Sequence, residues 1–355
     1  MTANVTANVT ANLTGASPGR QTVDPATGGD SGKPCIALVI GDPAGIGPEL
    51  VARLLADSST RPPSRVLLIG SRDAIEAGAS SAGLSSPLQA ADVELVDWPG
   101  VGRGPFPRAV AGADNGEFML QMLALGASMV QQRQADALCF APLNKSALRA
   151  GGMQTEDELR WFAELLRWHG SCGELNVLDS LWTSRVTSHI PLKDVAENLS
   201  PGRVADAIAM ITEALRAAGK PQPQIAVCGL NPHNGDNGNF GREEIDVIAP
   251  GIAQSIQAGY PADGPFPADT IFVRARGGAY DGIVTMYHDQ GQIAMKLMGF
   301  ERGVTVQGGL PIPVTTPAHG TAYDIAGQGV ANPGAMRAAF ALACAMGLQR
   351  RRGLV

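Results

Sequence analysis

The sequence predicts an α/β protein whose sheet is largely parallel, and three observations support this fold class. Short apolar runs bounded by Gly or Pro alternate along the chain with segments whose apolar residues recur at helical spacing. The length of 355 residues suffices for two domains and a large core. The apolar share is ordinary, the charge is modest, and Gly and Ala are abundant, as is typical of α/β enzymes.

The sequence predicts a disordered N-terminal tail followed by alternating strands and helices. Residues 1–32 repeat Thr-Ala-Asn-Val and then drift through Ser, Gly, Pro and Asp, which predicts a disordered tail because so little apolar area can be buried. Beyond it we expect strands at 36–40, 65–70, 93–97 and 135–141, a helix that the stretch 41–49 opens and that runs through Leu55, and a helix at 116–134. Residues 71–91 and 98–115 predict loops or a weak helix.

The second half continues the alternation of strands and helices. We expect helices at 156–168, 200–218, 243–258 and 335–348. We expect strands at 185–190, 224–230 and 282–286, and a further strand directly after residues 267–270. Ser200 is the expected cap of its helix and Pro201 lies in the first turn.

Charge and cysteine usage exclude several classes of protein. The net charge of -6 argues against a nucleic-acid partner, which normally meets a basic surface. Five scattered cysteines without a Cys-x-x-Cys pair favour a reduced, cytoplasmic chain. No segment reaches the length needed to span a membrane, and the N-terminus has neither the basic start nor the apolar core of a signal peptide.

Three of the five histidines, His189, His233 and His288, stand at the ends of predicted strands. A lone histidine is usually structural, and His169 is interpreted in that way. Strand ends of one parallel sheet converge in space, so three such histidines predict a site for Zn²⁺ or another first-row divalent ion. An open coordination position would remain for a substrate oxygen.

Several other candidate residues allow both a functional and a structural interpretation. The Gly-rich turn at 41–49 could hold a phosphate or could merely pack a helix on a strand. Lys145 follows a strand and could contact substrate or be solvated. Asp269 and Asp289 are candidate acid/base groups, although many aspartates only cap helices. Lys296 could neutralise a substrate carboxylate or phosphate.

The segment from His319 to Asn332 suits a dinucleotide. It contains small residues, backbone amides, one imidazole and one carboxylate, Asp324. Short Gly-rich loops let backbone N–H groups approach a pyrophosphate.

Four motifs together resemble the 4-hydroxythreonine-4-phosphate dehydrogenase family: residues 41–49 (Gly-Asp-Pro-Ala-Gly-Ile-Gly-Pro-Glu), 228–233 (Cys-Gly-Leu-Asn-Pro-His), 267–270 (Pro-Ala-Asp-Thr) and 286–291 (Met-Tyr-His-Asp-Gln-Gly). The resemblance runs from about residue 36 to the C-terminus. Residues 319–333 also resemble the cofactor loop of the wider isopropylmalate and isocitrate dehydrogenase group. The fold implied is a three-layer α/β/α arrangement of two domains with an active-site cleft between them.

The resemblance implies a domain organisation and a homodimer with shared active sites. Residues 33–145 with 296–355 would form the cofactor-side domain, and residues 146–295 the central domain with the metal ligands and the dimer interface. His189 and His233 would bind the metal ion from one subunit and His288 from the other. Zn²⁺ is the first choice, with Mn²⁺, Co²⁺ or Mg²⁺ as alternatives.

The implied chemistry is oxidation of a secondary alcohol by NAD, followed by loss of CO₂ from a β-keto acid. Asp269, Asp289 and Lys296 would be the catalytic residues. Substrate would contact Lys145, Gln154, Thr155, Lys296 and Thr305. NAD would contact His319, Gly320, Asp324, Ile325 and Asn332. A carboxylate at Asp324 suits the ribose hydroxyls of NAD and repels the 2′-phosphate of NADP.

The chain departs from the family pattern where substrate would be recognised. The usual Gly-His-Thr-Glu element is Met153-Gln154-Thr155-Glu156, Thr305 replaces an Asn, and Val314 replaces an Arg. Losing an arginine removes a bidentate anion clamp. The pattern therefore resembles a substrate-divergent paralogue such as terephthalate dihydrodiol dehydrogenase. A zinc hydrolase and a catalytically silent binding protein are the alternatives from other classes.

Overall fold

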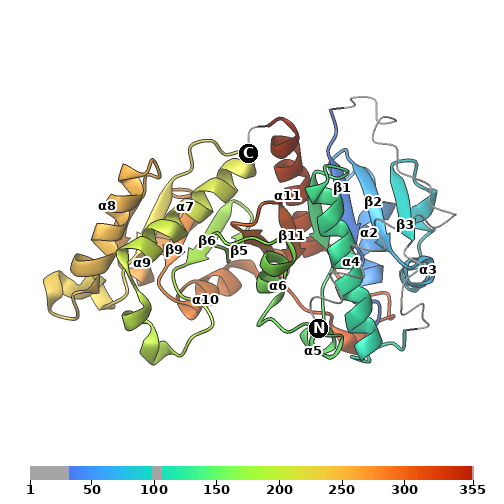
Figure 1. The fold of residues 1–355 in the computed structure, drawn as a ribbon, viewed down its shortest axis with the longest axis horizontal. Coiled ribbons are helices and arrows are strands. Elements are labelled where there is room, and N and C mark those ends of the chain that lie inside the picture. Colours follow the sequence, from blue (N-terminus) through green and yellow to red (C-terminus); the bar gives the residue numbers. More distant parts are fainter. Residues whose placement is uncertain (1–31, 98–105, 354–355) are drawn as a thin grey trace. The chain divides into compact units, whose positions relative to one another are not determined.

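The computed structural model describes residues 32–97 and 106–353, and the chain forms two compact units (Figure 1). Of the described residues, unit 1 contains 32–97, 106–169 and 310–353, and unit 2 contains 170–309. The predicted tail at 1–32 lies outside the described residues apart from Gly32. The domain boundaries expected from the sequence, at 145/146 and 295/296, stay a prediction.

Unit 1 is built on five parallel strands in the order β3-β2-β1-β4-β11. These are β1 (Cys35–Val39), β2 (Arg65–Gly70), β3 (Val93–Asp97), β4 (Ala137–Phe140) and β11 (Val314–Pro317). β1 and β4 are buried along their whole length, as expected for strands covered on both faces. The expected strands at 65–70 and 93–97 are confirmed.

The helices of unit 1 cover both faces of these strands. Gly126 of α4 packs on the side chain of Leu138, whereas Gly347 of α11 packs on the Cβ atom of Ala137. Neighbouring residues of a strand face opposite ways, so α4 and α11 form two outer layers. The helical elements are α2 (Gly47–Ala56), α3 (Arg72–Ser81), η1 (Pro87–Gln89), α4 (Ala113–Gln131), α5 (Lys145–Ala150), α6 (Glu158–Leu165), η7 (Tyr323–Ile325) and α11 (Gly334–Arg351).

Unit 2 contains six strands in the order β10-β5-β6-β9-β7-β8. They are β5 (Gly173–Leu178), β6 (Leu181–Arg185), β7 (Ile225–Cys228), β8 (Asp263–Phe266), β9 (Gly282–Thr285) and β10 (Val304–Gly308). β6, β9, β7 and β8 run parallel, while β5 is antiparallel to both β6 and β10. The parallel part carries the histidine segments.

The helices of unit 2 also lie on two faces. Gly282 packs on Ile211 of α7, whereas its neighbour Ile283 shares a buried cluster with Phe272 of α9 and Met295 of α10. The helical elements are η2 (Leu192–Asp194), η3 (Ala196–Asn198), α7 (Pro201–Ala217), η4 (Pro232–Gly238), the π-helix η5 (Glu244–Ile248), α8 (Ala249–Gln257), α9 (Ala268–Arg276), α10 (His288–Gly299) and η6 (Phe300–Arg302). Ser200 caps α7 as expected. No helix among the described residues is long and apolar enough to cross a bilayer.

Two predicted strands are wrong. The strand expected at 185–190 is β6, which begins at Leu181 because a turn at Asp179, with φ of 52°, folds it back on β5. The strand expected after 267–270 is helix α9, although its sequence is rich in β-branched residues. Its buried residues Ile271, Phe272 and Ala275 recur at helical spacing, and this packing overrides local propensity.

Candidate active site

The three candidate metal ligands follow three neighbouring strands of unit 2. His189 follows β6, His288 follows β9, and His233 follows β7; β9 lies between the other two and pairs in parallel with both. The carboxyl ends of these strands therefore meet at one edge. The rings of His189 and His288 lie with their centroids 6.0 Å apart.

His288 is the first residue of α10 and contacts the carboxylate that follows it. Its Nδ1 lies 2.6 Å from Oδ1 of Asp289. A carboxylate on Nδ1 favours the tautomer with its proton there and leaves Nε2 free to bind a metal ion. Asp289, expected as an acid/base group, thus lies where it can orient a ligand.

His233 lies in an unusual backbone segment. All five residues from 233 to 237 have φ between 44° and 77°, a left-handed turn that β-carbons disfavour. Four of the five are Asn, Gly, Asp and Asn, the residue types that tolerate this conformation best. The string Asn234-Gly235-Asp236-Asn237 is the sequence signal for this turn, and it was not used above.

A buried carboxylate, Glu244, braces the left-handed turn. Its Oε1 accepts hydrogen bonds from the backbone N–H groups of Leu230 and Asn231, both at 2.7 Å, and its Oε2 accepts one from the Asn231 side chain at 3.0 Å. Gly235 passes so close that a Cβ atom there would lie 2.6 Å from Oε2 of Glu244. Only glycine fits at that position.

The other predicted catalytic groups of unit 2 lie on its surface. Asp269 is exposed in the first turn of α9, and Lys296 is exposed on α10. Thr305 is half-buried in β10. Within unit 2, no three His, Cys, Asp or Glu side chains among the described residues place their ligand atoms together as a metal site would. Among these residues, His189, His233 and His288 do not form such a group.

The remaining predicted substrate contacts belong to unit 1. Lys145 begins α5, whose cap is the side chain of Asn144, accepting from the N–H of Ala147 at 2.9 Å. Gln154 is exposed and Thr155 is half-buried, both in the segment before α6. Their contact with substrate stays a prediction.

The expected cofactor segment follows β11 in unit 1. The Nδ1 atom of His319 lies 3.0 Å from the carbonyl of Gly320, and Ile325 belongs to the short helix η7. Asp324 is exposed, and its carboxylate accepts no hydrogen bond from the described residues, so turn capping does not account for it. Asn332, in contrast, accepts from the N–H of Gly334 at 2.9 Å at the start of α11.

The Gly-rich turn at 41–49 packs directly against the cofactor segment. The N–H of Ile46 donates to the carbonyl of Thr321 at 3.0 Å, and a Cβ atom at Gly45 would lie 2.8 Å from that same oxygen. Glycine at position 45 permits this approach. This contact is with the cofactor segment, so the choice between phosphate binding and packing of a helix on a strand stays a prediction.

A buried pair, Asp42 and Tyr323, joins the same two segments and was missed from the sequence. Asp42 is fully buried and accepts hydrogen bonds from Tyr323 Oη at 2.5 Å, the N–H of Ala44 at 2.9 Å and Asn115 Nδ2 at 3.3 Å. Burial raises the pKa of the Asp42 carboxyl above its ordinary value, while the Tyr323 hydrogen bond opposes the rise. Burial and the neighbouring carboxylate raise the pKa of Tyr323.

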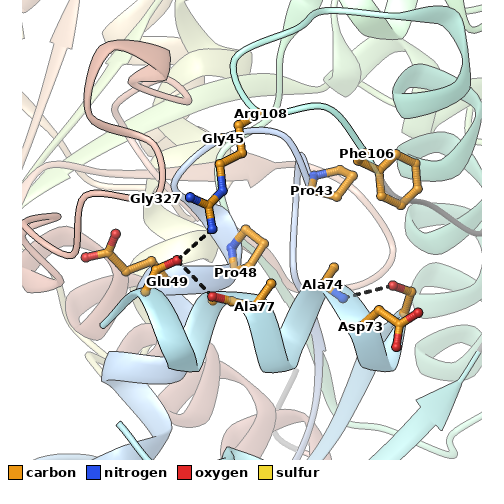
Figure 2. A pocket seen from close by; sticks show the side chains of 13 residues that line it. Pro43, Gly45, Pro48, Glu49, Asp73, Ala74, Ala77, Phe106, Arg108 and Gly327 are labelled. Carbon is orange, nitrogen blue, oxygen red and sulfur yellow. Dashed lines mark hydrogen bonds between the residues drawn. The ribbon is translucent and has the colours of Figure 1, made fainter. Parts of the chain in front are cut away.

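A cavity of about 260 Å³ lies beside the cofactor segment within unit 1. Figure 2 shows Arg108 reaching to Gly327, with Phe106 and Pro43 lying together elsewhere on the wall. The Arg108 guanidinium donates to Ser81 Oγ at 3.2 Å, and a Cβ atom at Gly327 would overlap it. The cofactor segment contains no Lys or Arg of its own. The positive charge beside it comes from Arg108, which lies far away in the sequence.

Comparisons with known proteins agree with this architecture. The family described as "Pyridoxal phosphate biosynthetic protein PdxA" matches residues 63–343. A Pseudomonas aeruginosa protein provisionally named 4-hydroxythreonine-4-phosphate dehydrogenase 2 is 54% identical over 327 residues, which cover 88% of this chain and 97% of the relative.

Two crystal structures align over most of the chain. The 4-hydroxythreonine-4-phosphate dehydrogenase of Klebsiella pneumoniae aligns with a TM-score of 0.79 and 31% identity, covering 90% of this chain and 100% of that one. A terephthalate 1,2-cis-dihydrodiol dehydrogenase of Burkholderia xenovorans aligns with a TM-score of 0.64 and 26% identity, covering 87% and 98%. The expected resemblance and fold class are confirmed, and the chain is a member of the PdxA family and an oxidoreductase acting on CH–OH groups.

Proposed function

We propose that the chain is an NAD-dependent and divalent-metal-dependent dehydrogenase of the cytoplasm. It oxidises the secondary alcohol of a small hydroxy acid and then releases CO₂ from the β-keto acid formed. The observation that carries the proposal is the placement of His189, His288 and His233 directly after three adjacent parallel strands. The dehydrogenase family favours this reaction over the zinc hydrolysis that three histidines could also support.

The donor set fits a divalent ion. Three imidazoles suit Zn²⁺ or a similar first-row ion, and the His288–Asp289 contact supplies the outer carboxylate that often orients a metal-binding histidine. When bound, the ion would polarise the alcohol oxygen and NAD would accept the hydride.

The chain's own groups would handle charge and protons. Lys296, an exposed residue of α10, would hold the substrate carboxylate. The Asp289 carboxylate contacts Nδ1 of His288 and would orient that imidazole. We therefore assign removal of the substrate's hydroxyl proton to Asp269. Loss of CO₂ leaves a carbanion equivalent at the α-carbon, which takes up one proton. In unit 1 the exposed Asp324 would accept hydrogen bonds from the adenosine ribose, next to His319, Gly320 and Ile325.

A homodimer would complete the site. His189 and His233 would come from one subunit and His288 from its partner, consistent with the absence of a three-histidine set among the described residues of unit 2. Large apolar side chains on α10 support a covered face there: Ile293 is 60% exposed and Leu297 is 84% exposed.

The substrate class has two candidates. The names of the relatives reported above favour a hydroxy acid phosphate such as 4-hydroxythreonine 4-phosphate. Val314 favours an unphosphorylated hydroxy acid or dihydrodiol carboxylate, because it is fully buried in β11 and provides no anion clamp where the family pattern has arginine. Lys145 and Lys296 are the cations that would have to bind a phosphate.

A substrate panel tests the proposal. Metal-free enzyme is supplied with NAD and Zn²⁺, Mn²⁺, Co²⁺ or Mg²⁺, and the absorbance of reduced nicotinamide is followed with 4-hydroxythreonine 4-phosphate, unphosphorylated hydroxy acids and diol carboxylates. We expect metal-dependent reduction of NAD and release of CO₂. Turnover that persists unchanged in the presence of a chelator would contradict the metal role, and a best substrate carrying phosphate would reject the second substrate class.

A further inference from the structure

The end of β9 is hydrogen-bonded to the end of β6 through one peptide carbonyl. The Met286 carbonyl accepts from the Thr187 N–H at 3.1 Å and from the Thr187 hydroxyl at 2.8 Å. Thr187 and Met286 are both fully buried. Each precedes a candidate ligand closely in sequence, Thr187 before His189 and Met286 before His288, so this contact fixes the offset between the two histidine segments.

The end of β9 is also tied to the end of β7, and here one side chain makes the link. Gln290, in the first turn of α10, accepts from the N–H of Met286 through Oε1 at 2.7 Å. Its Nε2 donates to the carbonyl of Gly229 at 2.9 Å. Gly229 leads from β7 into the segment that contains His233. The Gln290 amide is thus a bridge between the His288 and His233 segments.

Helix capping accounts for only half of this arrangement. A side chain in the first turn of a helix often reaches back to a preceding N–H, which explains the bond to Met286. Glu would serve that purpose as well as Gln. The second bond needs a donor facing the Gly229 carbonyl, and a carboxylate has none. An amide is therefore required because two strand ends must be held at once.

We propose that Gln290 is a positioning residue that sets the spacing of His189 and His233, the two metal ligands that one subunit would provide, acting through Met286 and Gly229. The inference rests on the metal-dependent function proposed above. Together with Thr187, it gives one hydrogen-bonded path across β6, β9 and β7, from the His189 segment to the His233 segment. The loop bearing His233 is left-handed, and Glu244 holds the N–H groups of Leu230 and Asn231, which directly follow Gly229. The Gly229 bond therefore adds a second anchor at the start of this loop.

The test compares metal binding by three variants of the full-length chain after removal of metal. Gln290→Met keeps the side-chain length and loses both bonds, while Gln290→Glu keeps only the bond to Met286. Gln292→Met is the matched control, because Gln292 lies on the same helix and donates to Asn176 Oδ1 at 2.6 Å, and it bonds neither to Met286 nor to Gly229. Zn²⁺ affinity is measured by calorimetry, and coordination geometry by the visible spectrum of bound Co²⁺.

We expect Gln290→Met to bind Zn²⁺ about tenfold more weakly, the lower end of the effect seen when residues outside the first ligand shell are changed. Its Co²⁺ spectrum should differ from that of the parent, while Gln292→Met should match the parent in both. A lower unfolding temperature with unchanged affinity and spectrum would show a purely structural role and overturn the inference.

Two further outcomes are decisive. If Gln290→Met does not fold, Gln290→Glu takes its place, and a parent-like Co²⁺ spectrum in that variant overturns the inference. If the parent itself binds none of these ions, the proposed metal centre fails, and the inference fails with it. A parent that binds Zn²⁺ together with a Gln290→Met variant that binds equally well rejects the inference alone.

Discussion

Replacing Tyr323 by Phe removes one oxygen atom from the contact between the Gly-rich turn and the cofactor segment. The lost group is a donor to the fully buried carboxylate of Asp42, at 2.5 Å. A hydrogen bond to a charged group contributes about 1.5–3 kcal/mol. At about 1 kcal/mol per 2–4 °C for a unit of roughly 200 residues, the unfolding temperature should fall by roughly 3–12 °C.

The pH dependence distinguishes this mechanism from simple loss of packing. The folded-state pKa of Asp42 is raised above its ordinary 3.8, so its contribution to stability is greatest at low pH and declines as pH rises through the folded pKa. The Tyr323 bond lowers that pKa, so the variant should have a still higher one. The difference in unfolding free energy between parent and variant should therefore be small in acid and grow towards neutral pH.

Thermal unfolding at a series of pH values, with and without NAD, measures this difference. Tyr280→Phe is the control, because Tyr280 Oη accepts from Arg274 Nη2 at 3.2 Å and makes only a long bond of 3.4 Å to Asp263, a carboxylate on an exposed residue. That change should cost about 1 kcal/mol or less with little pH dependence. A pH-independent loss in Tyr323→Phe, or no loss at all, would refute the reasoning.

Three further changes test the site. His233→Asn removes the imidazole but tolerates the left-handed backbone better than Ala, so it should lose metal-dependent turnover while unfolding near the parent's temperature; full activity without added metal would contradict the ligand role. Asp324→Lys with Ile325→Tyr should shift the ratio of kcat/KM for NAD over NADP, expected at ~10 or more in the parent, towards NADP; equal values in the parent would remove the role of Asp324. Glu244→Gln should destabilise the turn by about 1.5–3 kcal/mol, because it replaces one hydrogen-bond acceptor by a donor. The control Glu243→Gln, at the neighbouring residue, should cost far less. The unfolding temperature and Zn²⁺ calorimetry measure both effects.

Local patterns in the sequence, such as apolar runs bounded by turn residues, predicted much of the fold. The strands 65–70 and 93–97 were assigned correctly because apolar runs bounded by turn residues determine them locally. The positions of His233 and His288 after strands were also predictable, since the expected strands 224–230 and 282–286 end close to the ends of β7 and β9, whereas the strand before His189 was placed too late in the chain. Helix α9 was misassigned because its β-branched residues favour a strand until packing against the core decides otherwise.

Contacts between distant segments could not be read in this way. The Asp42–Tyr323 pair, the approach of Arg108 to Gly327 and the bond from Gln290 to Gly229 each join residues far apart in the chain. No periodicity links such residues, so only the folded structure reveals them. They concern the support of the site more than the groups that would perform its chemistry.

The discontinuous course of unit 1 governs the order in which the chain can fold during synthesis. β11 pairs with β4 through Val314 and Leu138, and α11 covers the same strands, yet both elements are synthesised after residues 170–309 of unit 2. Until then the outer edge of β4 lacks that partner, while the continuous stretch of unit 2 has already been made. An unpaired strand edge invites association with other chains. Nascent chains that stall before residue 314 should therefore depend on chaperones, and shortening α11 from its C-terminal end should lower the yield of folded protein more than its small size suggests.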